Sequence, residues 1–142
     1  MGISKDIHNR QANVVSVLAP VAVAASNNGE SLTRLDTSKY VNLALVVHAG
    51  VCTDGEYTIS VGTSAVAAGG AFAAQTVNLS EWVSGVAPTV ITSSEDEKIW
   101  AYDVNIDRLD NRYIAPVITE SSGGTTGVIL GLSWVGELKR GV

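Results

Sequence analysis

Residues Lys98 to Thr119 read KIWAYDVNIDRLDNRYIAPVIT and hold two stretches in which apolar and polar residues alternate, separated by a polar turn. In the first stretch every second position is apolar: Trp100, Tyr102, Val104 and Ile106. That period of two is typical of a β-strand that buries one face. The second stretch, from Tyr113 to Val117, is predicted to return as the hairpin partner of the first, and Pro116 places it at a sheet edge or at a bulge.

An earlier block, Leu35 to Ser60, has the same design and reads LDTSKYVNLALVVHAGVCTDGEYTIS. Apolar residues alternate with others from Tyr40 to Ala49, and the second face of that strand is itself half apolar, which suggests packing on both sides. Asp54-Gly55 is a strong turn dipeptide, because glycine tolerates positive φ and the aspartate bonds its local backbone. The sequence therefore predicts a hairpin from Tyr40 to Val61.

The remaining strand signals lie near the two ends of the chain. The larger apolar residues between 12 and 25 are mostly β-branched, and Pro20 interrupts any helix there, which predicts two short strands or one bent strand. Residues 126–136 predict the last strand, with four apolar residues on its core face: Val128, Leu130, Leu132 and Trp134. Many short strands without a convincing long helix predict an all-β fold, an antiparallel β-sandwich with jelly-roll-like connectivity. No linker divides residues 12–142, which we expect to form a single domain.

Composition and charge limit the classes of partner. The 142 residues carry a net charge of -5, so no sequence-wide positive field exists to attract nucleic acid or an anionic membrane. The nine Lys and Arg residues are scattered, and only folding could assemble them into a basic patch. The apolar stretch from Val14 to Ala25 is too short to cross a bilayer. We therefore expect neither a nucleic acid nor a membrane as partner.

The residues that usually carry chemistry are few and isolated. Cys52 is the sole cysteine and ends an apolar strand, so we expect a small buried hydrophobe. His8 and His48 have no ligand partners at metal-binding spacing, and His48 is expected at the surface, on the second face of its strand. Arginines intervene among Asp103, Asp107 and Asp110, so turn capping and exposed ion pairs account for this cluster. We predict no enzyme, no cofactor and no metal site.

Two further features concern surfaces. Trp82, Trp100 and Trp134 could form a stacking platform for a carbohydrate, although Trp100 and Trp134 fall on strand faces that are typical of a core. Residues 1–11, MGISKDIHNRQ, are polar, contain both charge signs and show no period. They predict a flexible N-terminal arm that becomes ordered on contact with a partner.

The order of the motifs resembles one known group of proteins. LDTSKY is followed by VNLALVVHAG and CTDGEYTISV, and then come EDEKIWAYDV, NRYIAPVIT and GGTTGVILGLSWVG. This succession, from about Leu32 to Gly136, resembles small structural proteins of tailed bacteriophages, the head decoration or cement proteins. The stretch from Gly62 to Pro88 follows no pattern of that family.

The resemblance implies a viral structural protein that binds the outer surface of an assembled capsid and stabilises it by bridging subunits of the major capsid protein. It also implies self-association, which we expect to give a homodimer in preference to a trimer. The protein would be made in the host cytoplasm and would reside on the outside of the capsid in the virion.

Within the arm, the apolar and basic residues Ile3, Ile7 and Arg10 are the expected shell contacts. Two alternatives stay open at this point. One is another virion component, such as a tail or head-completion protein. The other is a carbohydrate-binding β-sandwich module, which would need exposed aromatic side chains on a concave face.

Overall fold

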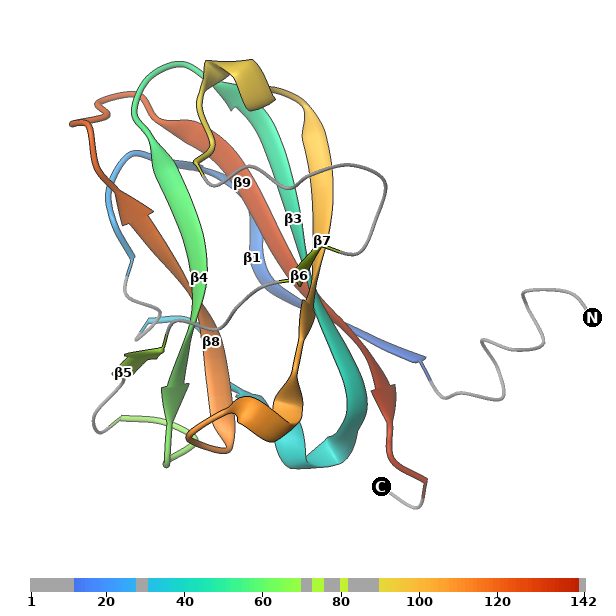
Figure 1. Ribbon diagram of the computed structural model, residues 1–142. Coiled ribbons are helices and arrows are strands. Elements are labelled where there is room, and N and C mark those ends of the chain that lie inside the picture. Colours follow the sequence, from blue (N-terminus) through green and yellow to red (C-terminus); the bar gives the residue numbers. More distant parts are fainter. Residues whose placement is uncertain (1–11, 28–30, 70–72, 76–79, 82–89, 141–142) are drawn as a thin grey trace, which may run out of the picture.

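The chain folds into two antiparallel β-sheets that face each other (Figure 1). The computed structural model describes residues 12–27, 31–69, 73–75, 80–81 and 90–140. The larger sheet has the order β1-β9-β3-β7-β6 and the smaller sheet the order β2-β8-β4-β5. The predicted all-β class and antiparallel β-sandwich are therefore confirmed. Successive strands often change sheet, as jelly-roll-like connectivity requires, and that finer description stays a prediction.

The strand bounds show which parts of the sequence build each sheet. The larger sheet consists of β1 (Ala12–Val23), β9 (Val128–Leu138), β3 (Tyr40–Cys52), β7 (Lys98–Val104) and β6 (Ser80–Glu81). The smaller sheet consists of β2 (Leu35–Asp36), β8 (Tyr113–Glu120), β4 (Tyr57–Ser64) and β5 (Ala73–Gln75). In the described loops lie three short 3-10 helices: η1 (Thr37–Lys39), η2 (Ser93–Glu95) and η3 (Ile106–Arg108).

Both predicted hairpins are wrong, although all four of their strands exist. β3 belongs to the larger sheet and β4 to the smaller one, so the loop containing Asp54 crosses between the sheets. In the same way, the loop after β7 crosses from the larger sheet to β8 in the smaller one. The true neighbours of β3 are β7 and β9, and the true neighbours of β8 are β2 and β4. A turn signal marks a reversal of the chain but does not determine which strand becomes the partner.

Pro116 lies in a strand that has neighbours on both sides. On one side it pairs with Val61 of β4. On the other side β8 meets only short segments, the Ile118–Asn27 bridge and the Ile114–Leu35 pair. In an antiparallel ladder, the backbone nitrogens of successive residues point to alternate sides of the strand. The nitrogen of Pro116 points to the side of these two short contacts and lies between them, where the described residues provide no strand. Pro116 therefore lies in an interior strand and not at the predicted edge or bulge, and its nitrogen faces a point where no described strand needs a donor.

The core lies between the two sheets and is built from the predicted strand faces. Twenty buried residues form one cluster, and every core position predicted for β9 belongs to it. Cys52 is 4% exposed, so its prediction as a buried hydrophobe is confirmed, and burial raises the pKa of its thiol. β1 is one strand rather than two, with register shifts on either side of Leu18. The second shift contains Pro20, which cannot donate to the ladder.

Candidate functional site

Several residues singled out in the sequence lie outside the described part of the chain. These are the arm, its expected contacts Ile3, Ile7 and Arg10, and also Trp82. Trp100 and Trp134 are 8% and 1% exposed, in agreement with the expectation that they belong to the core. A carbohydrate platform requires exposed aromatic rings, and these two side chains do not supply one.

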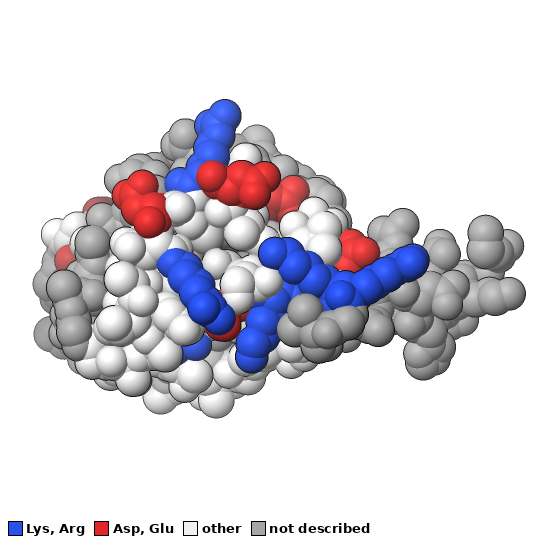
Figure 2. All heavy atoms as spheres, turned by 90° about the horizontal axis from the view of Figure 1, so that it is seen from below, with Lys and Arg blue, Asp and Glu red and all other residues white. Residues whose placement is uncertain are grey.

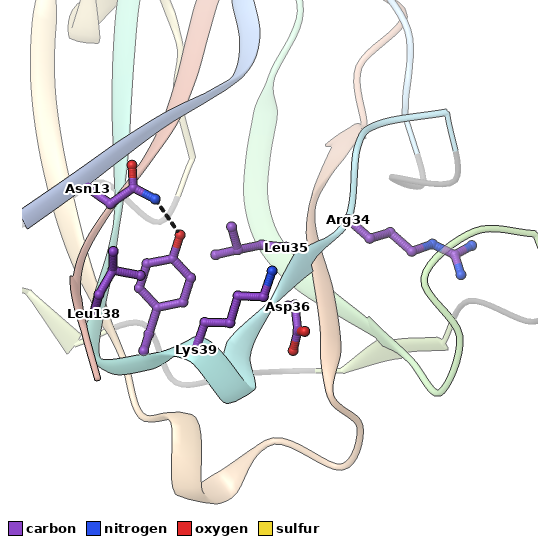
Figure 3. Close-up of a pocket in the computed structure, with 7 residues that line it drawn as sticks. Asn13, Arg34, Leu35, Asp36, Lys39 and Leu138 are labelled. Atoms are coloured by element: carbon purple, nitrogen blue, oxygen red, sulfur yellow. Dashed lines mark hydrogen bonds between the residues drawn. The ribbon is translucent and has the colours of Figure 1, made fainter. Parts of the chain in front are cut away.

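A hollow of about 410 Å³ opens at one side of the sandwich, between β1 and the segment that leads from β2 into η1 (Figure 3). Its lining residues are Asn13, Arg34, Leu35, Asp36, Lys39, Tyr40 and Leu138. The side-chain amide of Asn13 donates to the Tyr40 hydroxyl at 2.8 Å, which ties β1 to the start of β3. The walls combine apolar groups with a polar rim, as ligand sites commonly do, but the hollow is an open gap between the sheets.

Two charged groups at this hollow are engaged in holding the fold together. Arg112 Nε and Nη2 donate to the two carboxylate oxygens of Asp36 at 2.7 and 2.6 Å, and this pairing holds the pKa of Asp36 well below its usual range. Arg34 points away from the hollow in Figure 3 and donates to Ser64 Oγ and to the carbonyl oxygens of Val66 and Gly69. The guanidinium groups therefore connect loops instead of facing into the hollow.

The loops at one end of the sandwich are rich in acid. Here lie six carboxylates and a single ammonium group: Asp54, Glu56, Glu95, Asp96, Glu97, Glu120 and Lys98. The pairing of Tyr57 with Ile91 and Glu120 brings the three acidic segments to the same end. We call this set of residues the acidic end. It contains η2, at the top of Figure 1.

Asp54 organises the acidic end through hydrogen bonds. Its carboxylate accepts from the backbone N–H groups of Gly127 at 2.6 Å and of Thr125 and Thr126 at 3.0 Å, and from the Thr125 hydroxyl at 2.8 Å. These donors, with Gly127 first, lower the pKa of Asp54 to about 2. The aspartate of the predicted turn thus binds the loop between β8 and β9.

We expect Asp54→Asn to lower the unfolding temperature at neutral pH, because an amide offers one acceptor oxygen and no charge to this loop. Since folding lowers the pKa from 3.8 to about 2, the carboxylate stabilises the protein above about pH 4. That contribution is lost as the pH falls through about 2. The difference between wild type and variant, followed by circular dichroism melts, should therefore shrink as the pH is lowered from 4 to 2.

Glu56→Gln is the matched control for this experiment. It removes one charge from the same loop, and the Glu56 side chain makes no hydrogen bond with any residue that the structure describes. The unfolding temperature of Glu56→Gln should stay close to that of the wild type at every pH used for Asp54→Asn. An equal effect of both variants would show that net charge, and not the bonding of Asp54, governs the stability of this end.

The opposite end of the sandwich gathers most of the exposed cations. They are Lys39, Arg108, Arg112, Lys139 and Arg140, and Figure 2 looks onto them. The Lys139 N–H donates to the Lys39 carbonyl at 2.8 Å, and Arg112 joins them through its bond to Asp36. We call these five residues the basic end. Carboxylates such as Asp107 and Glu137 lie among them, so the end is mixed rather than uniformly positive.

Residues 1–11, which lie outside the described part of the chain, join the domain at the basic end. β1 begins at Ala12, which pairs with Glu137, two residues before Lys139. Residues 1–11 are therefore attached beside these cations. The sequence could not show this grouping, because its members come from three separate segments and meet only in the folded chain.

The outer face of the larger sheet is weakly charged and partly apolar. Val14, Ile99 and Ile129 are 67%, 61% and 43% exposed there, and no third layer covers them within the described ranges. The expected packing on both sides of β3 is therefore not seen in the single chain. His48 is exposed on this face, as predicted.

The described residues contain no group of three or more His, Cys, Asp or Glu side chains that could hold a metal ion. Arg112 pairs with Asp36, and Asn105 caps η3 by accepting from the Asp107 N–H. None of the helices placed by the structure is long and apolar enough to span a membrane. Comparison with known proteins gives no match to a family, a curated protein or a solved structure.

Proposed function

We propose that this protein is a structural component of a tailed-phage virion that binds the outer surface of the assembled capsid and stabilises it by bridging major capsid subunits. The order of the sequence motifs and the β-sandwich support this proposal. The observation that carries it is the uneven distribution of charge: most of the exposed cations of the described residues lie, with carboxylates among them, at the end where residues 1–11 join, and six carboxylates with a single ammonium group lie at the other.

A protein that carries most of its cations at one end and an excess of carboxylates at the other is oriented by its charges when it approaches a charged surface. A chain with a net charge of -5 is repelled by an acidic surface as a whole, but its basic end can approach when that end leads. Residues 1–11, with Ile3, Ile7 and Arg10 as the proposed contacts, start from that end and would be delivered to the shell with it. Several copies, each making modest contacts with two shell subunits, would bind the lattice through avidity.

Charge reversal at the basic end tests this proposal. We expect Lys139→Glu to weaken binding to heads assembled without the protein by about threefold to tenfold, because a rim charge contributes a modest Coulombic attraction and its reversal adds repulsion. The measurement is co-sedimentation of the purified protein with these heads over a range of protein concentrations. Added salt should reduce the difference between wild type and variant by screening it.

Lys98→Glu is the matched control, since it makes the same change of charge at the acidic end. Lys98 Nζ donates to the Ser94 carbonyl on an exposed loop. The binding of Lys98→Glu to the heads should equal that of the wild type. Equal losses in the two variants would refute an oriented contact. Wild-type protein that fails to bind heads at all would refute the capsid function and favour the tail or head-completion alternative.

A further inference from the structure

The long edge strand of the larger sheet differs from every other sheet edge in the described residues. The two sheets end in β1, β6, β2 and β5. Three of these strands have two or three residues, whereas β1 has twelve. A long edge presents a row of backbone N–H and C=O groups that can pair with another chain, and proteins usually shorten, bend or charge such edges. Among the described residues, β1 is therefore the one long edge strand.

The first five residues of β1 lack the usual protection. No charged residue occurs from Ala12 to Val23. The devices that blunt this edge, the two register shifts and Pro20, all lie after Ser16. From Ala12 to Ser16 the strand pairs with β9 in unbroken register, so its free side is straight and regular. This segment is therefore suited to receive another strand.

The side chains along this segment are also incompletely buried. Val14 is 67% exposed on the outer face, opposite Val135 of β9. Val15 points inward, opposite the buried Trp134, yet is only partly buried. Beside it, Asn13 lines the open hollow between the sheets, whose walls include Leu35 and Leu138. A strand added here would cover apolar surface on both faces of the sheet.

We propose that a second copy of this chain occupies this edge, with residues 12–16 of the two β1 strands paired antiparallel about a two-fold axis at Val14. Asn13 of one copy then lies opposite Val15 of the other, and the two Val14 side chains meet. Because paired residues project to the same face, Val15 of the second copy closes the mouth of the hollow beside Asn13. This inference deepens the proposed function by specifying how the protein associates with itself.

Charge within β1 permits a second copy as the occupant. The strand is uncharged, so it meets itself without any like-charge pair across the new ladder. Antiparallel pairing near the start of β1 places the two acidic ends at opposite extremes of the dimer, where they repel least. The two basic ends, and both points from which residues 1–11 start, come together at its centre. Such a dimer would present two arms to neighbouring shell subunits.

The test is the mass of the isolated protein in solution, measured by sedimentation equilibrium over a wide concentration range. We expect a monomer–dimer equilibrium in which Val14→Lys raises the dissociation constant about tenfold or more, because it sets two ammonium groups opposite each other at the axis. Ile99→Lys is the control: Ile99 is similarly exposed on the same sheet, but it lies on β7, three strands away from β1. Its dissociation constant should match that of the wild type.

A charge-swapped mixture provides a positive result. Val14→Lys and Val14→Glu chains should each be more monomeric than wild type and should form heterodimers when mixed, since the two variants then place opposite charges across the axis. Hydrogen exchange of the amides of residues 12–16 should slow as the protein concentration rises. The hydrogen-exchange readout uses the wild-type chain and therefore covers the case in which a variant folds poorly.

Four results of the association measurements would each overturn the inference: a wild-type monomer at every concentration, an unchanged dimer in Val14→Lys, an equal loss in Ile99→Lys, or no heterodimer in the mixture. Amide protection that is independent of concentration would mean that a segment of the same chain covers the edge, and it would overturn the inference as well. All of these measurements use isolated protein. Failure here therefore leaves the co-sedimentation test of capsid binding intact.

Discussion

Replacing Trp134 with alanine is expected to lower the free energy of unfolding by about 3 to 5 kcal/mol, the usual cost of truncating a large buried aromatic side chain. Trp134 is 1% exposed and lies in the middle of β9, the strand that joins β1 to β3. It pairs with Val15 on one side and Leu45 on the other. The cavity would thus open between the sheets, where three strands meet. Urea denaturation followed by circular dichroism measures the loss.

Val135→Ala is the control for this prediction. Val135 is the next residue of β9, but its side chain points to the outer face and is only partly buried. We expect it to cost less than about 1 kcal/mol, as substitutions away from the core usually do. A loss as large as that of Trp134→Ala would contradict the assignment of the two faces and would mean that the outer face is covered in solution. The comparison therefore also bears on self-association.

The faces of the strands could be predicted from the sequence because one physical requirement determines them. A half-buried strand must place its apolar side chains at every second position, and this period is visible without knowledge of the partner strands. Leu45 and Trp134 are buried as their positions predict, and so are Tyr102 and Val61. The all-β fold class was predicted from the same alternation of apolar residues.

Strand pairing could not be predicted in this way. The Asp54-Gly55 turn has the composition of a hairpin loop, but the Asp54 carboxylate bonds to the loop before β9, and the chain crosses to the other sheet. These bonds join residues more than 70 positions apart, and nothing in the local sequence of the turn signals them. Local alternation specifies a strand, whereas long-range contacts select its neighbour.

The candidate surfaces also include one feature that is visible in the local sequence and one that depends on long-range contacts. The charge-free run at the start of β1 is visible in the sequence, and it would have identified an unprotected edge if β1 had been known to lie there. The basic end is not visible, because Lys39 and Lys139 are brought together by a backbone hydrogen bond between segments 100 residues apart. Sequence reasoning assigned shell contact to Ile3, Ile7 and Arg10. The fold adds a place of attachment for that arm, next to the cations.

Replacing Gly127 with alanine is expected to destabilise the protein by roughly 2 to 6 kcal/mol, the sum of a strained backbone and an overpacked contact. Gly127 has a φ of +86°, a conformation that L side chains rarely adopt. A Cβ atom built there would also overlap the carbonyl group of Val23 in the neighbouring chain segment. The Gly127 N–H and C=O meanwhile bond to Asp54 and Thr53, so the residue cannot shift without breaking the link between two loops.

Gly123→Ala separates the two causes of that loss. Gly123 also has a positive φ, +74°, but a Cβ atom there would have no neighbour within 4 Å. It should therefore show the backbone cost alone, about 1 to 2 kcal/mol. Denaturation of both variants gives the comparison, and the excess in Gly127→Ala measures the contact with Val23. Equal losses would mean that the end of β1 moves aside readily, and that the closure of the sandwich at the acidic end depends on Asp54 rather than on the close approach of these two segments.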